Sequence, residues 1–175
     1  MPSLSLSRRK AAAPPPPEAS VWTASRFVSA TPPEVLRSLT DPELIGTWAP
    51  IDFEVDGLRG RRLRSGSHAW VNGSLAGVSA EFEIDVLRAD EHGLTLAARG
   101  PVTLDVDYRI EPADVGVYVE AEIAIQRERG LSGRVLRAAT GALLSGGALD
   151  RALRRLAGEL TPLDELDDAE FAIAA

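Results

Sequence analysis

The chain contains no cysteine, which excludes disulfide bonds, thiolate zinc sites and cysteine nucleophiles. Histidine is nearly as scarce, because His68 and His92 are the only two, and a metal site built from several histidines is therefore excluded as well. We expect neither a metal nor another cofactor. Lys10 is the only lysine among the 175 residues, and every other basic side chain is an arginine.

Long hydrophobic runs are also missing. No stretch approaches the roughly 20 apolar residues that a membrane-spanning helix needs, so we expect no integral membrane insertion and a cytoplasmic protein. The formal charge of −7 argues against bulk electrostatic attraction to nucleic acid or to anionic membranes. The hydrophobic and charged contents are those of an ordinary globular domain.

The two ends of the chain differ in composition from the middle. Residues 1–19 combine a small basic cluster with an alanine run and four consecutive prolines, which predicts a disordered tail or polyproline spacer. Residues 161–175 are acidic and are expected to form a frayed tail. We therefore place one globular domain at residues 20–160. Either tail could contact a protein partner.

The stretch Leu131–Leu160 organises the rest of the chain. Apolar and small residues recur there at steps of three and four, which predicts a long helix with one dry face. Arginines on the other side form a basic face, a second possible contact with a protein partner. The dry face comprises Leu131, Val135, Ala138, Ala142, Gly146, Leu149, Leu153, Leu156 and Leu160, and the basic face Arg134, Arg137, Arg151, Arg154 and Arg155.

A strand, two short helices and a series of strands are predicted before this helix. Val21–Ala30 is the first strand. Thr31 and Asp41 are each followed by proline and an acid, which is typical of a helix start. Further strands are predicted near residues 51–55, 66–73, 78–87, 94–99, 102–110 and 117–125, and their short connections imply an antiparallel meander.

The alternation along these strands predicts which side chains share a face. Across odd-length loops the inward-facing residues keep the same parity of residue number, here even, and across the even-length loop at 111–116 they change to odd numbers. One register therefore collects the apolar residues on one face and the carboxylates on the other. A solvated sheet face explains these carboxylates without acid/base pairs or a cation site. The inward set includes Phe82, Ile84, Leu96, Leu104, Val106, Tyr108, Val119 and Ile123, and the outward set Glu81, Glu83, Asp85, Asp105, Asp107, Glu120 and Glu122.

Three segments resemble, in their order and spacing, the N-terminal signature of the START-like, Bet v 1-like helix-grip superfamily. They are Ala30–Val35, Leu39–Leu44 and Trp48. The likeness is greatest to the polyketide cyclase/dehydrase and lipid-transport branch (SRPBCC) of this superfamily and covers Val21–Leu160. It implies an α+β helix-grip fold, in which a curved antiparallel sheet of six to seven strands wraps around a long C-terminal helix, with two short helices after the first strand. It also implies a hydrophobic cavity for lipids, quinones or polyketide-like molecules, but no particular mechanism.

The inward face and the helix suggest which residues line that cavity. Tyr108 is the only clear polar group, and its hydroxyl could meet a ligand oxygen, a backbone carbonyl or a water. Gly146 could form the cavity wall and its gate, or simply bend the helix to fit the sheet. The expected ligand-binding residues are Trp48, Trp70, Phe82, Ile84, Leu96, Leu104, Val106, Tyr108, Val119, Ala142 and Gly146.

Trp70 shares one side of its strand with His68 and Asn72, and the turn that follows decides which side that is. A four-residue turn sets Trp70 opposite Glu81 on the outer face, whereas a five-residue turn or a bulge at Gly73 puts it in the cavity. Only in the second case would His68 be a candidate general base, so otherwise we expect no catalytic residue.

Arginines are concentrated in the loop at 57–64, which we expect to be mobile. They could steer an acidic ligand to the cavity mouth or simply be solvated. The arginines are Arg59, Arg61, Arg62 and Arg64.

Three functions remain open at this stage. The leading one is a non-enzymatic carrier or binder of a small hydrophobic molecule. The second is a polyketide cyclase or aromatase, which needs several convergent polar groups. The third is a protein-interaction module that uses the acidic sheet face, the basic helix face or the tails.

Overall fold

The structure is a computed structural model that describes residues 19–161. The predicted terminal tails lie outside these residues, apart from Ala19 and Thr161. The elements in chain order are β1 (Ser20–Val28), α1 (Pro32–Thr40), α2 (Pro42–Trp48), β2 (Phe53–Asp56), β3 (His68–Leu75), β4 (Val78–Asp90), β5 (Gly93–Arg99), β6 (Val102–Ala113), β7 (Gly116–Glu128), α3 (Gly130–Ser145) and α4 (Ala148–Leu160).

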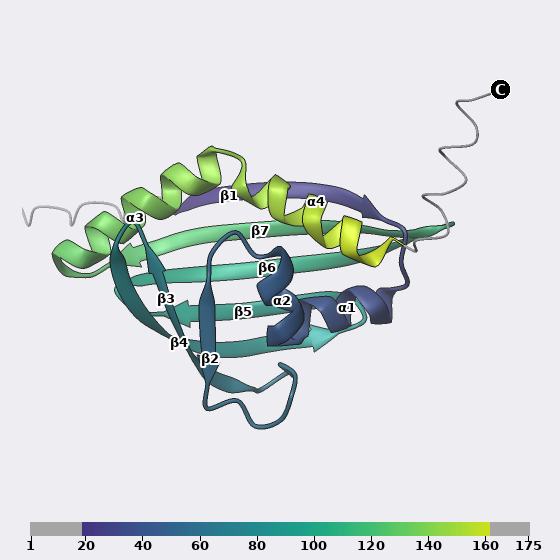
Figure 1. Ribbon diagram of the computed structural model, residues 1–175, viewed down its shortest axis with the longest axis horizontal. Coiled ribbons are helices and arrows are strands. Elements are labelled where there is room, and N and C mark those ends of the chain that lie inside the picture. The colour runs from purple at the N-terminus through teal and green to yellow at the C-terminus, as the bar shows by residue number, and fades with distance from the viewer. Residues whose placement is uncertain (1–18, 162–175) are drawn as a thin grey trace, which may run out of the picture.

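The seven strands form one antiparallel sheet in the order β1-β7-β6-β5-β4-β3-β2. Figure 1 shows α3 and α4 following one another along β1 and β7, while α1 and α2 lie beside α4, farther across the strands towards β5 and β4. Residues of α1, α4 and the inner face of the sheet share one hydrophobic core, which includes Val35, Leu39, Leu153 and Leu156. The predicted helix-grip fold is confirmed.

The predicted strand register is also confirmed. Ile84 faces Ala98 across β4 and β5, Leu96 faces Val106, and Val106 in turn faces Ile123. Ile84, Leu96, Val106 and Ile123 all belong to the predicted inward set, so the alternation correctly predicts which face they share. It does not predict the bulge between Val86 and Arg88, which keeps this face across the two-residue turn from β4 to β5.

Both short helices begin where the sequence predicts. The Thr31 backbone N–H and hydroxyl donate to the Glu34 carboxylate at 2.8 and 2.7 Å, and these bonds, the backbone one first, lower the pKa of Glu34. Asp41 caps α2 by accepting a hydrogen bond from the Glu43 N–H at 3.3 Å. The two caps fix where the short helices begin.

The C-terminal helical stretch is divided at Gly146-Gly147 into α3 and α4. Gly147 has a φ of +80°, a left-handed conformation that favours glycine. The predicted dry face is correct in α4, which buries Leu149, Leu153 and Leu156, and wrong in α3.

In α3 the buried residues are instead Gly133, Leu136 and Leu144. Leu131 and Val135 are 78% and 48% exposed. The prediction assumed one unbroken helix from Leu131 to Leu160. The glycine pair changes the direction of the helix axis and rotates α4 relative to α3, so residues spaced at three and four no longer share one face across the break.

Candidate functional site

An apolar pocket of about 240 Å³ lies between α2, β2 and the inner face of β3 to β6. Its volume is slightly below the range of about 300–1,000 Å³ that is common for small-molecule sites, so it suits a small ligand. Four expected ligand-binding residues, Trp48, Ile84, Leu96 and Tyr108, come together in its lining. The complete lining is Pro42, Ile45, Trp48, Ala49, Pro50, Ile51, Phe53, Val55, Leu63, Ala69, Val71, Ile84, Leu96 and Tyr108.

Tyr108 is the one ionisable group in this lining. The side chain is 8% exposed, and burial raises the pKa of its hydroxyl to about 12. Within residues 19–161 the hydroxyl forms no hydrogen bond. It is not among the completely enclosed polar atoms of this range that lack a partner, which are Arg26 Nε and Arg88 Nε, so it keeps some accessible surface. A nearly buried phenol normally has a partner, so its hydroxyl is left to bond with whatever occupies the pocket.

Trp48 holds Tyr108 in place from α2. The two rings meet edge to face, with centroids 6.0 Å apart and an interplanar angle of 79°. The Trp48 indole N–H donates to the carbonyl oxygen of Ser38 at 3.3 Å. Because Trp48 is 3% exposed and anchored at both its ring and its nitrogen, it is a fixed wall of the pocket.

The loop between β2 and β3 covers one side of the pocket through Leu63. The Leu63 N–H donates to the Thr40 carbonyl oxygen at 2.8 Å. Arg61 and Arg62 lie 3.4 and 3.8 Å from the Asp41 carboxylate, which is 1% exposed. The loop expected to be mobile is therefore tied to α1 and α2, and two of its arginines are already paired.

The other two arginines of this loop lie elsewhere. Arg59, Arg64 and His68 line a separate hollow of about 440 Å³. This hollow and the apolar pocket have no lining residue in common. The geometry therefore places no arginine of this loop in the pocket lining.

Several expected ligand-binding residues lie outside the pocket. Phe82, Leu104 and Val106 are half-buried on the inner face, and Val119 is completely buried in the core. Ala142 and Gly146 are exposed, which is contrary to the prediction that Gly146 faces the concave apolar surface. Gly146 lies at the break between α3 and α4 and does not line this pocket.

Trp70, His68 and Asn72 lie on the outer face of the sheet. A two-residue turn, Ala76-Gly77, joins β3 to β4 and pairs Trp70 with Glu83 and His68 with Asp85. Trp70 is 41% exposed, so its predicted place among ligand-binding residues is wrong. This turn is shorter than the four-residue and five-residue turns considered above. Like the four-residue turn it has an even length, and it therefore places Trp70 on the outer face.

His68 belongs instead to a group of charged residues on the outer face. Its Nδ1 lies 2.9 Å from the Asp85 carboxylate and its Nε2 lies 3.7 Å from Glu83. The bond from His68, followed by the one from Arg99, lowers the pKa of Asp85. This placement removes the condition under which His68 was a candidate general base.

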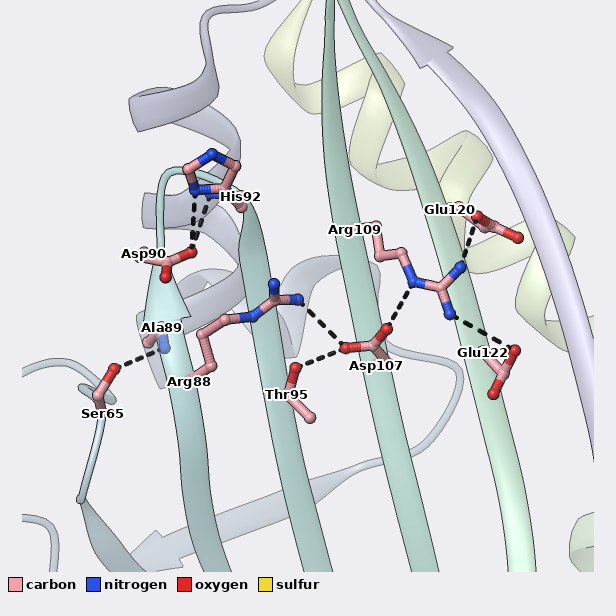
Figure 2. A network of polar contacts seen from close by, with 10 residues as sticks. All are labelled: Ser65, Arg88, Ala89, Asp90, His92, Thr95, Asp107, Arg109, Glu120 and Glu122. Carbon is pink, nitrogen blue, oxygen red and sulfur yellow. Dashed lines mark hydrogen bonds and ion pairs between the residues drawn. The ribbon is translucent and has the colours of Figure 1, made fainter.

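Three further outer carboxylates, those of Asp107, Glu120 and Glu122, surround Arg109 on β6 and β7 (Figure 2). Arg109 reaches Asp107 at 2.9 Å, Glu120 at 3.2 Å and Glu122 at 3.8 Å. The bond to Asp107 is the main reason why the pKa of Arg109 is raised. These carboxylates lie on the solvated face that period-two placement predicted, where ion pairs contribute little to stability. Among residues 19–161 there is no group of three or more His, Asp or Glu that could hold a metal.

The pocket residues that sequence reasoning missed come mainly from α2 and β2. Ile45 lies on α2, Ile51 precedes β2, and Phe53 and Val55 lie on β2. The alternation of Ile51, Phe53 and Val55 with carboxylates was a sufficient signal for a half-buried strand. It gave no information on which strands that segment would face.

None of the helices in residues 19–161 is long and apolar enough to cross a membrane. No curated protein sequence matches the chain. Residues 21–161 match the family described as polyketide cyclase/dehydrase and lipid transport.

Solved structures share the fold over most of their length. A Thermus thermophilus protein has a TM-score of 0.61 at 14% identity, covering 81% of this chain and 97% of its own. A Chromobacterium violaceum protein has a TM-score of 0.59 at 17% identity, covering 82% and 99%. The major latex-like protein 151 of Panax ginseng has a TM-score of 0.57 at 11% identity, with the same coverage. At identities this low the likeness concerns the fold alone.

Proposed function

The chain belongs to the polyketide cyclase/dehydrase and lipid transport family, and from this premise we propose that it binds one small, mainly apolar molecule in the pocket at Tyr108. The observation that carries the proposal is Tyr108, which lines an apolar pocket and whose hydroxyl forms no hydrogen bond in residues 19–161. The ligand would therefore carry one hydrogen-bonding oxygen on an otherwise hydrocarbon body.

Apolar burial would supply most of the affinity, at about 25 cal/mol per Å² before the cost of ordering the ligand. The phenol would orient the ligand, since one hydrogen bond contributes about 0.5–1.5 kcal/mol. Its rigid support from Trp48 favours a single bound orientation. Leu63 and the anchored loop would limit the access of water.

The same lining gives less support to a cyclase or aromatase. Proton transfer near neutral pH needs a group whose pKa lies close to that pH, and burial raises the pKa of Tyr108 to about 12. His68 faces away from the pocket. We therefore propose binding or carriage, without acid/base catalysis by this lining.

A titration with the carbonyl-bearing naphthalene dye prodan tests the proposal. We expect a blue-shifted, saturable emission at one site per chain, and Tyr108→Phe should weaken binding by about two- to tenfold. Tyr118→Phe is the matched control, because Tyr118 is 52% exposed on the outer face. Equal effects of the two substitutions, or the absence of saturable binding, would contradict the proposal.

A further inference from the structure

The outer face of α3 carries an exposed apolar stripe with no partner in residues 19–161. Leu131, Val135, Ala138 and Ala142 follow one another at steps of three and four and therefore lie on one side of the helix. Leu131 is 78% exposed and Val135 48%. In α4, by contrast, the apolar stripe is buried against the rest of the protein.

Several arginines lie close to this stripe in the sequence. The segment 127–142 contains four arginines and a single acid, Glu128, whose carboxylate is paired with Arg137 at 3.0 Å. Arg127, Arg129 and Arg134 are exposed and form no ion pair within residues 19–161. The segment 127–142 is thus cationic, although the chain as a whole has a formal charge of −7.

The stability of α3 does not explain these arginines. In residues 19–161, α1, α2 and α4 each have an acid in the first turn, where it complements the positive end of the helix dipole. The first turn of α3 has none, and Arg129 occupies its N-cap. A cation at that end destabilises the helix slightly, so the arrangement suits an external anion better than it suits the isolated helix.

We propose that this face of α3 docks on an anionic lipid surface. An apolar stripe flanked by arginines is the arrangement by which a helix lies in the plane of a membrane interface, with its aliphatic side chains among the acyl chains and its cations among the phosphates. The acidic outer sheet does not prevent this, because charges more than about 10 Å away are largely screened at 0.1 M salt. If the pocket carries an apolar ligand, docking would bring it to the surface that holds such molecules.

Vesicle flotation of the full chain tests the proposal. We expect binding to vesicles of equal parts phosphatidylglycerol and phosphatidylcholine, release by salt, and no binding to phosphatidylcholine alone. Leu131→Gln with Val135→Gln should lower partitioning about tenfold, and Arg129→Gln with Arg134→Gln about fivefold per arginine. The matched controls, Val115→Gln at the β6–β7 turn and Arg155→Gln on α4, should bind like the wild type.

Flotation that none of these variants changes, or no flotation at all, would overturn the proposal. So would a concentration-dependent dimer that disappears in the apolar double variant, because the stripe would then belong to a second copy. The substituted side chains are exposed, so circular dichroism should show unchanged folding. Prodan binding, measured separately, should persist in every variant and keeps this test distinct from that of the pocket.

Discussion

The burial of the Tyr108 hydroxyl should make the free energy of unfolding depend on pH in the alkaline range. Burial raises its pKa from 10.0 to about 12, so between these values the unfolded chain loses a proton that the folded protein retains. The protonated phenol therefore stabilises the fold fully below pH 10, and this contribution is lost as the pH rises towards 12. At about pH 11 the loss is about 1.4 kcal/mol, and across the whole interval it is about 2 to 3 kcal/mol.

Urea unfolding followed by circular dichroism, at about pH 8, 10 and 11, measures this loss. Other groups contribute to alkaline unfolding, so the informative quantity is the difference between the wild type and Tyr108→Phe, which should lack the Tyr108 contribution. Tyr118→Phe should behave like the wild type. Because the chain has two tyrosines, the phenolate absorbance of the Tyr118→Phe variant comes from Tyr108 alone. An identical pH dependence in wild type and Tyr108→Phe would refute the reasoning.

Other substitutions test the supports of the pocket. Trp48→Ala should cost about 3–5 kcal/mol in the free energy of urea unfolding, because it removes an indole that is almost completely buried in the core; a cost below 1 kcal/mol would contradict this role in the core. Gly93→Ala should lower the free energy of unfolding by at least about 3 kcal/mol in the same assay. Gly93 has a φ of +137°, which strains an alanine, and the added Cβ would clash with the backbone carbonyl oxygen of Tyr108. Gly158→Ala, with open space around it, should instead stabilise α4 by about 0.5–1 kcal/mol. Asp41→Ala should cost about 1 kcal/mol through the lost cap and speed the release of prodan in stopped flow, since the loop that carries Leu63 loses its ion pairs; unchanged release would show that these pairs do not restrain the loop.

The sheet could be predicted because its information is local. Alternation places Leu96, Leu104 and Val106 on one face whatever the exact strand ends, and loop parity carries that assignment from strand to strand. The side of Trp70 could not be settled in the same way. It depends on the Ala76-Gly77 turn, in which Ala76 adopts a φ of +53° that alanine seldom takes.

The pocket was harder to predict than the sheet because it depends on how distant segments meet. Tyr108 and Trp48 were identified from the register and from the family resemblance, but Ile51 and Phe53 come from an edge strand whose packing the alternation does not specify. Gly146 was misplaced for a related reason. Periodicity within one helix says nothing about the rotation that a glycine pair introduces.

Native mass spectrometry of gently purified full-length protein tests the central claim most directly. We expect one small apolar molecule bound per chain, lost in Val71→Trp, which fills the pocket, and retained in Ala142→Leu, which adds volume on the exposed side of α3. A bound molecule that survives Val71→Trp but is lost in Ala142→Leu would contradict the account. So would a correctly folded wild type that carries no adduct and takes up no prodan.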